Sequence, residues 1–206
     1  MIRNVIFDLG GVLVTWRPQE IIDGFYADPA LRGALREHVF AHPDWVELDR
    51  GTLEERDAAE RFAERTGRPV AEMLALLDRV RESLQPVPAM VALAHRLQAR
   101  GLALYALSNI SPSMFEHIRA RHAFFELFSG IVISGAIKRV KPEPGIYEHL
   151  AETYSLAFEE SVFVDDLPAN VEAARRLGLA AILFENAEQC GREVERLLGA
   201  PASSAG

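Results

Sequence analysis

The chain has 206 residues, a formal net charge of −8 and a sequence pI near 5.3. This length is enough for one α/β domain with a small insert and a substantial core. The acidic balance leaves no basic stripe to neutralise the phosphates of a polymer, so we expect no nucleic-acid partner. A single cysteine, Cys190, excludes a disulfide framework and a cysteine metal cluster within one chain.

No segment approaches the ~20 consecutive apolar residues of a membrane-spanning helix. The short apolar run at the N-terminus contains Asp8, which does not fit a signal peptide. Together with the single cysteine, these features predict a protein of the reducing cytoplasm with no membrane partner.

The first predicted element is a short buried strand at residues 5–7 that leads directly to Asp8. Gly10 and Gly11 follow, and they let the backbone turn sharply close to a ligand. Because open α/β sheets bind ligands at the carboxyl ends of their strands, Asp8 is a candidate nucleophile. The alternative is an ordinary Asp-Gly turn at the end of a strand.

Residues 16–85 show helical periodicity without credible strands. A capping box at 52–55 predicts a helix that ends at Gly67, and apolar side chains at helical spacing over 70–84 predict another. We therefore predict that 16–85 is an inserted helical cap over the carboxyl end of the sheet, where a lid excludes water and selects substrates. The alternative is an independent helical subdomain.

Residues 86–200 alternate helices with strands. Strands are predicted at 102–107, 130–133, 161–164 and 179–183, and helices at 88–100, from 111 onward, and at 144–154, 169–177 and 188–198. Single helices between strands imply a parallel sheet with right-handed crossovers. The predicted fold class is α/β, with residues 1–15 and 86–200 forming a Rossmann-like parallel sheet with helices on both faces, and 201–206 forming a disordered tail.

Polar side chains follow two of the later strands. Ser108 and Asn109 offer a hydroxyl and an amide that can hydrogen-bond an anionic oxygen, although both types are also ordinary turn residues. Asp165 and Asp166 are adjacent carboxylates, which repel each other and favour a hard cation. Capping of the next helix would explain at most one of these two acids.

Lysine is rare in this chain. Of 22 basic residues only Lys138 and Lys141 are lysines, and both lie in one short segment before a Pro-Glu-Pro turn. A lysine in an arginine-rich chain marks a place where a compact ammonium is needed and a planar guanidinium would not substitute. Chance clustering of solvated surface lysines is the alternative.

The ordered set of these motifs resembles that of the haloacid dehalogenase superfamily of hydrolases. The matching motifs are Phe7-Asp8-Leu9-Gly10-Gly11-Val12, Leu107-Ser108-Asn109, Lys141-Pro142-Glu143-Pro144 with Ile146-Tyr147, and Val164-Asp165-Asp166 with Asn170. Residues 16–85 match the position of the family's helical cap, so the resemblance covers nearly the whole chain. The nucleophile loop, residues 50–52 and residues 165–170 are similar to the α-D-glucose-1-phosphate phosphatase-like branch.

The resemblance implies a metal-assisted reaction at Asp8. Asp8 would attack phosphorus and form an aspartyl-phosphate, which water then hydrolyses. It also implies that Mg²⁺ is held by Asp8, the backbone carbonyl of Gly10 and Asp166, with Asp165 nearby or acting through water.

The resemblance further implies that Ser108, Asn109 and Lys141 bind the phosphoryl oxygens of a small phosphorylated metabolite, with Lys141 also stabilising the reaction's charge. The chain departs from the family at Gly10, where most phosphatases of the family have an aspartate that protonates the leaving alcohol. A missing general acid costs about 10²–10⁴-fold in rate. Because the anomeric oxygen of a sugar 1-phosphate needs less protonation, the gap favours that substrate class.

The absence of a proton donor at Gly10 is also compatible with 2-haloacid dehalogenation, because a halide leaves without a proton. Charge counting favours the phosphatase: Asp8, Asp165 and Asp166 against Lys141 leave two negative charges, which a dication neutralises. Dehalogenases of the family work without metal, tend to have uncharged residues in place of the paired acids, and carry an aromatic residue where Gly10 stands. A third alternative is a catalytically weak module that binds a ligand or a partner.

Several residues near the nucleophile loop or in the predicted cap are candidates to face the leaving group, with ordinary packing as the alternative. These are Trp16, Arg17, Trp45, Asp49 and Arg50. The six histidines lie outside all four motifs and receive no catalytic role: His38, His42, His95, His117, His122 and His149.

Overall fold

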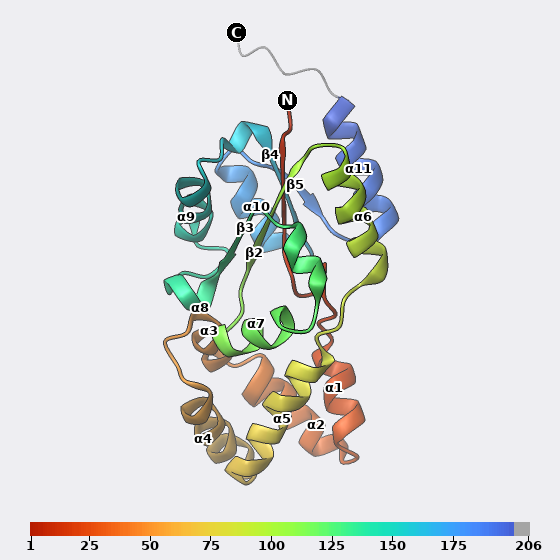
Figure 1. Cartoon of the computed structure of the whole chain (residues 1–206). Coiled ribbons are helices and arrows are strands. Elements are labelled where there is room, and N and C mark those ends of the chain that lie inside the picture. The colour runs from red at the N-terminus through yellow and green to blue at the C-terminus, as the bar shows by residue number, and fades with distance from the viewer. Residues whose placement is uncertain (200–206) are drawn as a thin grey trace.

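The computed structural model describes residues 1–199, so the predicted tail at 201–206 lies outside the described residues. Its centre is a five-stranded parallel sheet in the order β3-β2-β1-β4-β5 (Figure 1). The strands are β1 (Asn4–Phe7), β2 (Ala103–Ser108), β3 (Gly130–Ile133), β4 (Ser161–Asp165) and β5 (Ala180–Leu183). This arrangement confirms the predicted α/β fold with a parallel sheet.

β1 lies in the middle of the sheet, with β2 on one side and β4 on the other. Phe7 at the end of β1 is level with Ala106 of β2 and with Val164 of β4. Asp8 therefore leaves the sheet between the carboxyl ends of its two neighbours. The chain runs outward from β1 in both directions, and in such sheets the crevice at this switch point is where ligands bind.

Helices cover both faces of the sheet. They are α6 (Pro88–Ala99), α7 (Pro112–Arg119), α8 (Ser134–Ile137), α9 (Pro144–Tyr154), α10 (Pro168–Arg176) and α11 (Ala187–Gly199), with short 3₁₀ turns at Ala123–Leu127 and Phe158–Glu160. Val5 and Phe7 pack in one apolar cluster with α6 and α11, whereas Ile6 packs in a second cluster with α9 and α10 (Figure 1). Successive strand residues point to opposite faces, so near-continuous apolar strands bury both.

Between β1 and α6 the chain forms a helical insert. Its helices are α1 (Pro18–Phe25), α2 (Pro29–Leu35), a π-helical turn (Arg36–Phe40), α3 (Pro43–Arg50), α4 (Glu55–Thr66) and α5 (Val70–Ser83). The insert lies beyond the carboxyl end of the sheet (Figure 1). Its two connections run side by side, since the Thr15 N–H donates to the Gln85 carbonyl at 2.8 Å and the Val87 N–H to the Leu13 carbonyl at 2.8 Å. None of the helices within residues 1–199 is long and apolar enough to cross a membrane.

The predicted capping box at 52–55 is wrong. Helix α4 begins at Glu55, and the residue before it, Glu54, makes no side-chain capping bond. The Thr52 hydroxyl instead donates to the Glu47 carboxylate at 2.5 Å. The cause is the backbone of Gly51, whose left-handed φ of 72° ends α3 and turns Thr52 back toward the preceding helix. The predicted end of α4 at Gly67 and the predicted start of α7 after Ser111 are both confirmed.

The C-terminal end of α3 is fastened to the core. Ser134 Oγ donates to the carbonyl of Asp49 at 2.6 Å, Arg50 forms two hydrogen bonds with the Glu143 carboxylate at 2.8 and 3.0 Å, and Lys138 Nζ donates to the carbonyl of Gly51. We call this set of contacts, made by residues 49–51, the α3 junction. It gives one of the two lysines a specific role, which is to hold the insert on the core.

Candidate active site

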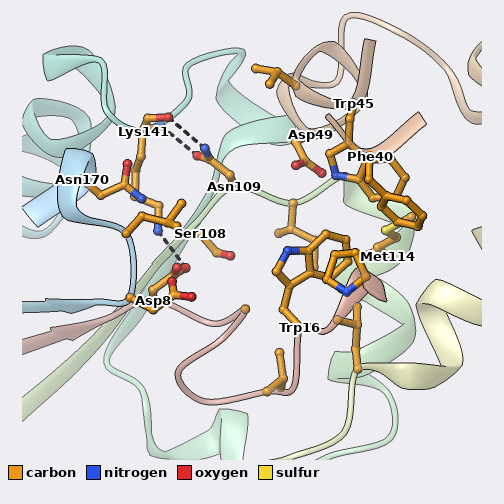
Figure 2. Close-up of a pocket in the computed structure, with 18 residues that line it drawn as sticks. Asp8, Trp16, Phe40, Trp45, Asp49, Ser108, Asn109, Met114, Lys141 and Asn170 are labelled. Atoms are coloured by element: carbon orange, nitrogen blue, oxygen red, sulfur yellow. Dashed lines mark hydrogen bonds and ion pairs between the residues drawn. The ribbon is translucent and has the colours of Figure 1, made fainter. Parts of the chain in front are cut away.

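A cavity of about 300 Å³ lies between the carboxyl end of the sheet and the insert (Figure 2). The core supplies its polar wall. The polar or glycine residues on this wall are Asp8, Gly10, Ser108, Asn109, Lys141, Asp166 and Asn170. Every residue that was predicted to attack, or to hold the metal or the phosphoryl group, lines this one cavity except Asp165, although the sequence spreads them over almost 160 positions.

Lys141 lies between two buried carboxylates. Its Nζ is 2.7 Å from Asp8 Oδ1 and 2.7 Å from Asp165 Oδ2, and its side chain is 1% exposed. Burying two carboxylates costs several kcal/mol per ion unless an opposite charge and hydrogen bonds replace the lost water. The ammonium of Lys141 fills that requirement, so the alternative of a solvated surface lysine is wrong.

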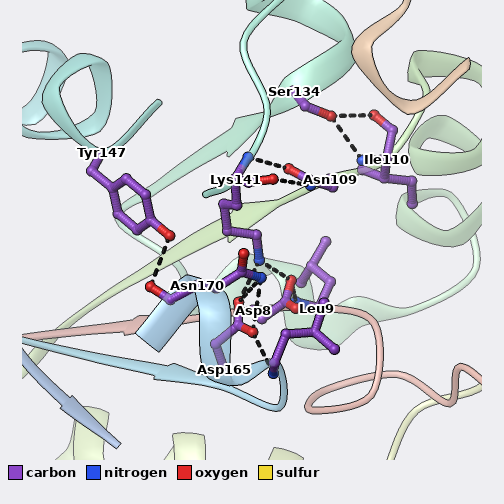
Figure 3. A network of polar contacts seen from close by, with 10 residues as sticks. Asp8, Leu9, Asn109, Ile110, Ser134, Lys141, Tyr147, Asp165 and Asn170 are labelled. Carbon is purple, nitrogen blue, oxygen red and sulfur yellow. Dashed lines mark hydrogen bonds and ion pairs between the residues drawn. The ribbon is translucent and has the colours of Figure 1, made fainter. Parts of the chain in front are cut away.

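Asn109 holds the backbone of Lys141. The Asn109 Nδ2 donates to the Lys141 carbonyl at 2.9 Å, and the Lys141 N–H donates to Asn109 Oδ1 at 2.8 Å (Figure 3). The sequence did not predict this pairing. It explains how a loop residue places its ammonium so accurately, while contact of Asn109 with a phosphoryl oxygen stays a prediction.

The two adjacent acids have different surroundings. Asp165 accepts hydrogen bonds from the Leu167 N–H at 2.8 Å and from Asn170 Nδ2 at 3.0 and 3.1 Å, besides its bond to Lys141 (Figure 3). Asp166 is partly exposed and lines the cavity. The carboxylate of Asp165 is thus occupied by protein donors, whereas Asp166 lines the cavity.

Asp8, Asp165 and Asp166 each place a carboxylate oxygen within 4.8 Å of the other two. Burial raises the pKa of Asp8 to about 7; the charges of Asp165 and Asp166 add to this rise, and Lys141 opposes it. Burial and the charge of Asp165 likewise raise the pKa of Asp166. The site is short of positive charge, and an oxygen-only donor set with excess negative charge fits a hard divalent cation such as Mg²⁺.

The loop after Asp8 passes close to Asp166. Gly11 has a φ of +77°, and a Cβ at this position would overlap the Asp166 carboxylate. A Cβ at Gly10 would instead make ordinary contacts with Trp16, at 3.6 Å from its Cβ and 3.8 Å from its Cγ. Gly11 is therefore required by backbone geometry and by a close approach, and Trp16 lies beside the position where the family's usual proton donor would begin.

The insert supplies an apolar, aromatic wall (Figure 2). The rings of Trp16, Phe40 and Trp45 pack against one another in tilted and edge-on arrangements, with centroids 5.6 Å apart for the two tryptophans and 4.7 Å apart for Phe40 and Trp45. Val46 and Leu167, which also line the cavity, are 44% and 54% exposed. The apolar lining of the cavity therefore includes side chains that solvent reaches.

The candidates near the loop and in the insert divide into two groups. Trp16, Trp45 and Asp49 line the cavity, whereas Arg17 is a surface residue and Arg50 belongs to the α3 junction. Sequence reasoning missed the other apolar residues that line the cavity, some from the insert and some from the core, because their spacing is that of ordinary core positions. These are Val14, Phe40, Val46, Leu84, Ile110, Met114 and Leu167.

The parallel sheet, the helical insert and the strand-end carboxylates define a hydrolase of the α/β class with a capped site. A family model described as haloacid dehalogenase-like hydrolase matches residues 2–178. The chain belongs to this family.

The proteins that are similar to the chain include the following curated relative and two solved structures. It is 30% identical to the sesquiterpene phosphatase astK of Aspergillus oryzae, over 96% of this chain and 97% of that protein. A predicted HAD-like family hydrolase from Porphyromonas gingivalis has a TM-score of 0.78 at 25% identity, with 98% and 100% of the chains covered. A HAD family enzyme from Bacteroides thetaiotaomicron, in complex with magnesium and inorganic phosphate, has a TM-score of 0.70 at 21% identity, with 90% and 95% covered.

Replacing Lys141 with methionine should destabilise the metal-free protein. Loss of the ammonium leaves two buried carboxylates unpaired, which costs about 3–5 kcal/mol in the free energy of unfolding at pH 7.5. Because the pKa of Asp8 is higher in the folded chain than in the unfolded chain, its ionisation already lowers stability as pH rises from about 4 toward 7. The loss should therefore be smaller at pH 5 than at pH 7.5, as measured by urea unfolding.

Lys138→Met is the matched control. The Lys138 ammonium is exposed at the α3 junction, so its loss should cost less than about 1 kcal/mol. Equal losses in the two lysine variants would contradict the role assigned to Lys141.

Gly11→Ala should be much more harmful than Gly10→Ala. At position 11 a methyl group meets a left-handed backbone, which costs about 1–2 kcal/mol, and it also displaces the Asp166 carboxylate. Thermal unfolding with and without Mg²⁺ measures both effects. We expect a lowered melting temperature and a reduced Mg²⁺-induced rise for Gly11→Ala; an intact rise would show that Asp166 is not displaced.

Proposed function

We propose that the chain is a Mg²⁺-dependent phosphatase that hydrolyses a phosphate monoester through an aspartyl-phosphate on Asp8. The observation that carries this proposal is the buried Asp8–Lys141–Asp165 group with Asp166 beside it at the floor of one cavity. It combines a nucleophile, a fixed ammonium and an oxygen donor set for a dication. These are the parts that phosphoryl transfer needs, since the reaction depends on positioning and on charge stabilisation.

The nucleophile is held in one orientation. Asp8 Oδ1 accepts a hydrogen bond from the Leu9 N–H at 2.7 Å and lies 2.7 Å from Lys141 Nζ. Two donors on the same oxygen prevent rotation of the carboxylate, so it meets an incoming phosphorus from a fixed direction.

The phosphoryl oxygens would be bound by Lys141 and Ser108. An ammonium has three N–H donors, and Lys141 uses two on Asp8 and Asp165, which leaves one for the ligand. Ser108 contributes a buried hydroxyl from the end of β2. Mg²⁺, when bound by Asp8, the carbonyl of Gly10 and Asp166, supplies positive charge to the transferring group.

The comparisons support this reaction. The relative astK is a sesquiterpene phosphatase, and the Bacteroides thetaiotaomicron enzyme of the same fold is described with magnesium and inorganic phosphate together. We transfer the reaction class from them to this chain because the residues at the cavity floor provide for it independently.

The leaving group we propose is an alcohol with a sizeable hydrocarbon part. The wall opposite Asp8 is formed by Trp16, Phe40, Trp45 and other apolar side chains, and Val46 is open to solvent beside them. Burial of apolar surface contributes about 25 cal/mol per Å², so this wall favours hydrocarbon over hydroxyl groups. The sesquiterpene substrate class in the name of astK agrees with this choice.

A sugar 1-phosphate is the second candidate. Gly10 favours it, because an anomeric leaving group needs little protonation, and so does the resemblance to the α-D-glucose-1-phosphate phosphatase-like branch. The lining of the cavity supports a sugar leaving group less than it supports a hydrocarbon leaving group. Among charged side chains of the insert only Asp49 lines it, within the described residues, and each buried hydroxyl of a sugar without a partner costs about 1–3 kcal/mol.

Dehalogenation and simple binding are the remaining alternatives. Dehalogenation needs no cation, which would leave the charge of Asp166 beside Asp8 without a counterion. A binding module would not need a nucleophile fixed by two donors on one oxygen.

Turnover of para-nitrophenyl phosphate tests the reaction class. We expect Mg²⁺-dependent release of nitrophenol that EDTA abolishes and that Asp8→Asn lowers by at least about 10³-fold, as for loss of a nucleophile. The matched control is Asp57→Asn, which makes the same change at an exposed carboxylate of α4. Chloride release from 2-chloropropionate in the presence of EDTA would establish the dehalogenase instead. If the protein shows neither activity, the binding module is favoured.

A series of alkyl phosphates tests the leaving group. We expect kcat/KM to rise by up to about fourfold per added CH₂ until the cavity is filled, corresponding to ~0.8 kcal/mol per buried CH₂. The kcat/KM for farnesyl phosphate should exceed that for glucose 1-phosphate. Val46→Asp, a change at an exposed position, should reduce the rise of kcat/KM with chain length and leave kcat/KM for short esters unchanged. A preference for glucose 1-phosphate over long alkyl esters would reject the apolar leaving group.

A further inference from the structure

A phosphatase with Gly10 lacks the proton donor that most members of its family carry two residues after the nucleophile, and an alkyl alcohol is a poor leaving group without one. The cavity holds one carboxyl group that the reaction so far does not use. Asp49 lines the cavity from the insert, and Figure 2 shows its carboxyl group across the cavity from Asp8. We propose that Asp49 donates the proton to the leaving alcohol, a role that rests on the proposed phosphatase function.

The position of Asp49 is fixed from the core. It is next to last in α3, and its carbonyl accepts a hydrogen bond from Ser134 Oγ at 2.6 Å. Arg50 and Gly51 continue the α3 junction on its C-terminal side. Although Asp49 belongs to the insert, its backbone is therefore fastened to the same part of the core that carries Lys141. A catalytic acid needs such fixing, because a displacement of about 1 Å costs on the order of 10²-fold in rate.

The surroundings of Asp49 suit an acid rather than a base. Trp45 and other apolar side chains form the wall around it. Burial and the negative charge of Asp8 raise the pKa of Asp49 well above its usual range, against the opposing effects of the Trp45 indole N–H and the Lys141 charge. Among the titratable residues that share the cavity, Asp166 adds a further negative charge. A raised pKa favours the protonated form of a carboxyl group, and this is the form that donates a proton to a leaving group.

The other titratable groups of the cavity are already engaged. Asp8 is the nucleophile, Lys141 holds two carboxylates, and Asp166 lies with Asp8 in the carboxylate cluster. None of the histidines within the described residues lines the cavity. Among the described residues that line the cavity, Asp49 is thus the one acid that the proposed reaction leaves unassigned.

Asp49 would give up its proton in the first half of the reaction and recover one in the second half. Asp8 Oδ forms a bond to phosphorus while the bond from phosphorus to the ester oxygen breaks, and the proton of Asp49 moves to that oxygen to release a neutral alcohol. In the second half, a water oxygen bonds to phosphorus, the Asp8–phosphorus bond breaks, and the Asp49 carboxylate takes one proton from the water. Asp49 is then protonated again, and the products are the alcohol and inorganic phosphate.

Asp49→Asn tests the role through its dependence on the leaving group. With a primary alkyl phosphate, kcat/KM should fall about 10²–10⁴-fold, the usual loss of a general acid. With para-nitrophenyl phosphate, whose phenolate leaves without a proton, formation of the aspartyl-phosphate should fall less than about tenfold. Because the second half also uses Asp49, the variant should show a stoichiometric burst of nitrophenol. Asp57→Asn is the control for removing an insert carboxylate.

The pH profile and the melting temperature give two further readouts. For the alkyl ester, the alkaline decline of kcat/KM in the wild type should disappear in Asp49→Asn. The Mg²⁺-induced rise in melting temperature should be unchanged, which shows that the fold and the cation site are intact. An alkyl-phosphate activity within threefold of wild type, or equal losses for the alkyl and aryl esters, would overturn the role of Asp49 alone. A wild type inert toward every phosphate ester would overturn the phosphatase function with it.

Discussion

The ion group of Lys141 with Asp8 and Asp165 is the interaction on which the site depends. Two carboxylates cannot be buried at the centre of a sheet without a nearby positive charge. Lys141 provides that charge at 2.7 Å from each, and Asn109 fixes its backbone in turn. In the proposed reaction, the ammonium that permits burial of Asp8 also stabilises the charge that develops on the phosphoryl group.

One ammonium does not balance the group, and this imbalance has a function in the proposed reaction. With Asp166 included, the cluster keeps an excess of negative charge, and the pKa of Asp8 is raised to about 7. Such a cluster binds a dication readily, because the cation lowers the energy of all its carboxylates together. The three clustered carboxylates with one ammonium therefore suit a divalent cation.

The insert gives the site its second half. The core contributes charged and hydrogen-bonding groups, whereas the insert contributes aromatic rings and the carboxyl group of Asp49. The α3 junction holds the two halves together through residues 49–51. In the proposed function, this division separates phosphoryl chemistry in the core from leaving-group recognition by the insert.

The sequence by itself determined the parallel sheet, the helical insert and the strand-end residues Asp8, Ser108 and Asp165, because apolar periodicity and local turn residues encode them directly. It misjudged the start of α4, where Gly51 turns the Thr52 hydroxyl back to Glu47. Only the tertiary structure decided that Lys141 is buried, that Trp16 and Trp45 line the cavity and that Asp49 faces Asp8. These facts depend on contacts between segments far apart in the chain, which periodicity within one segment does not encode.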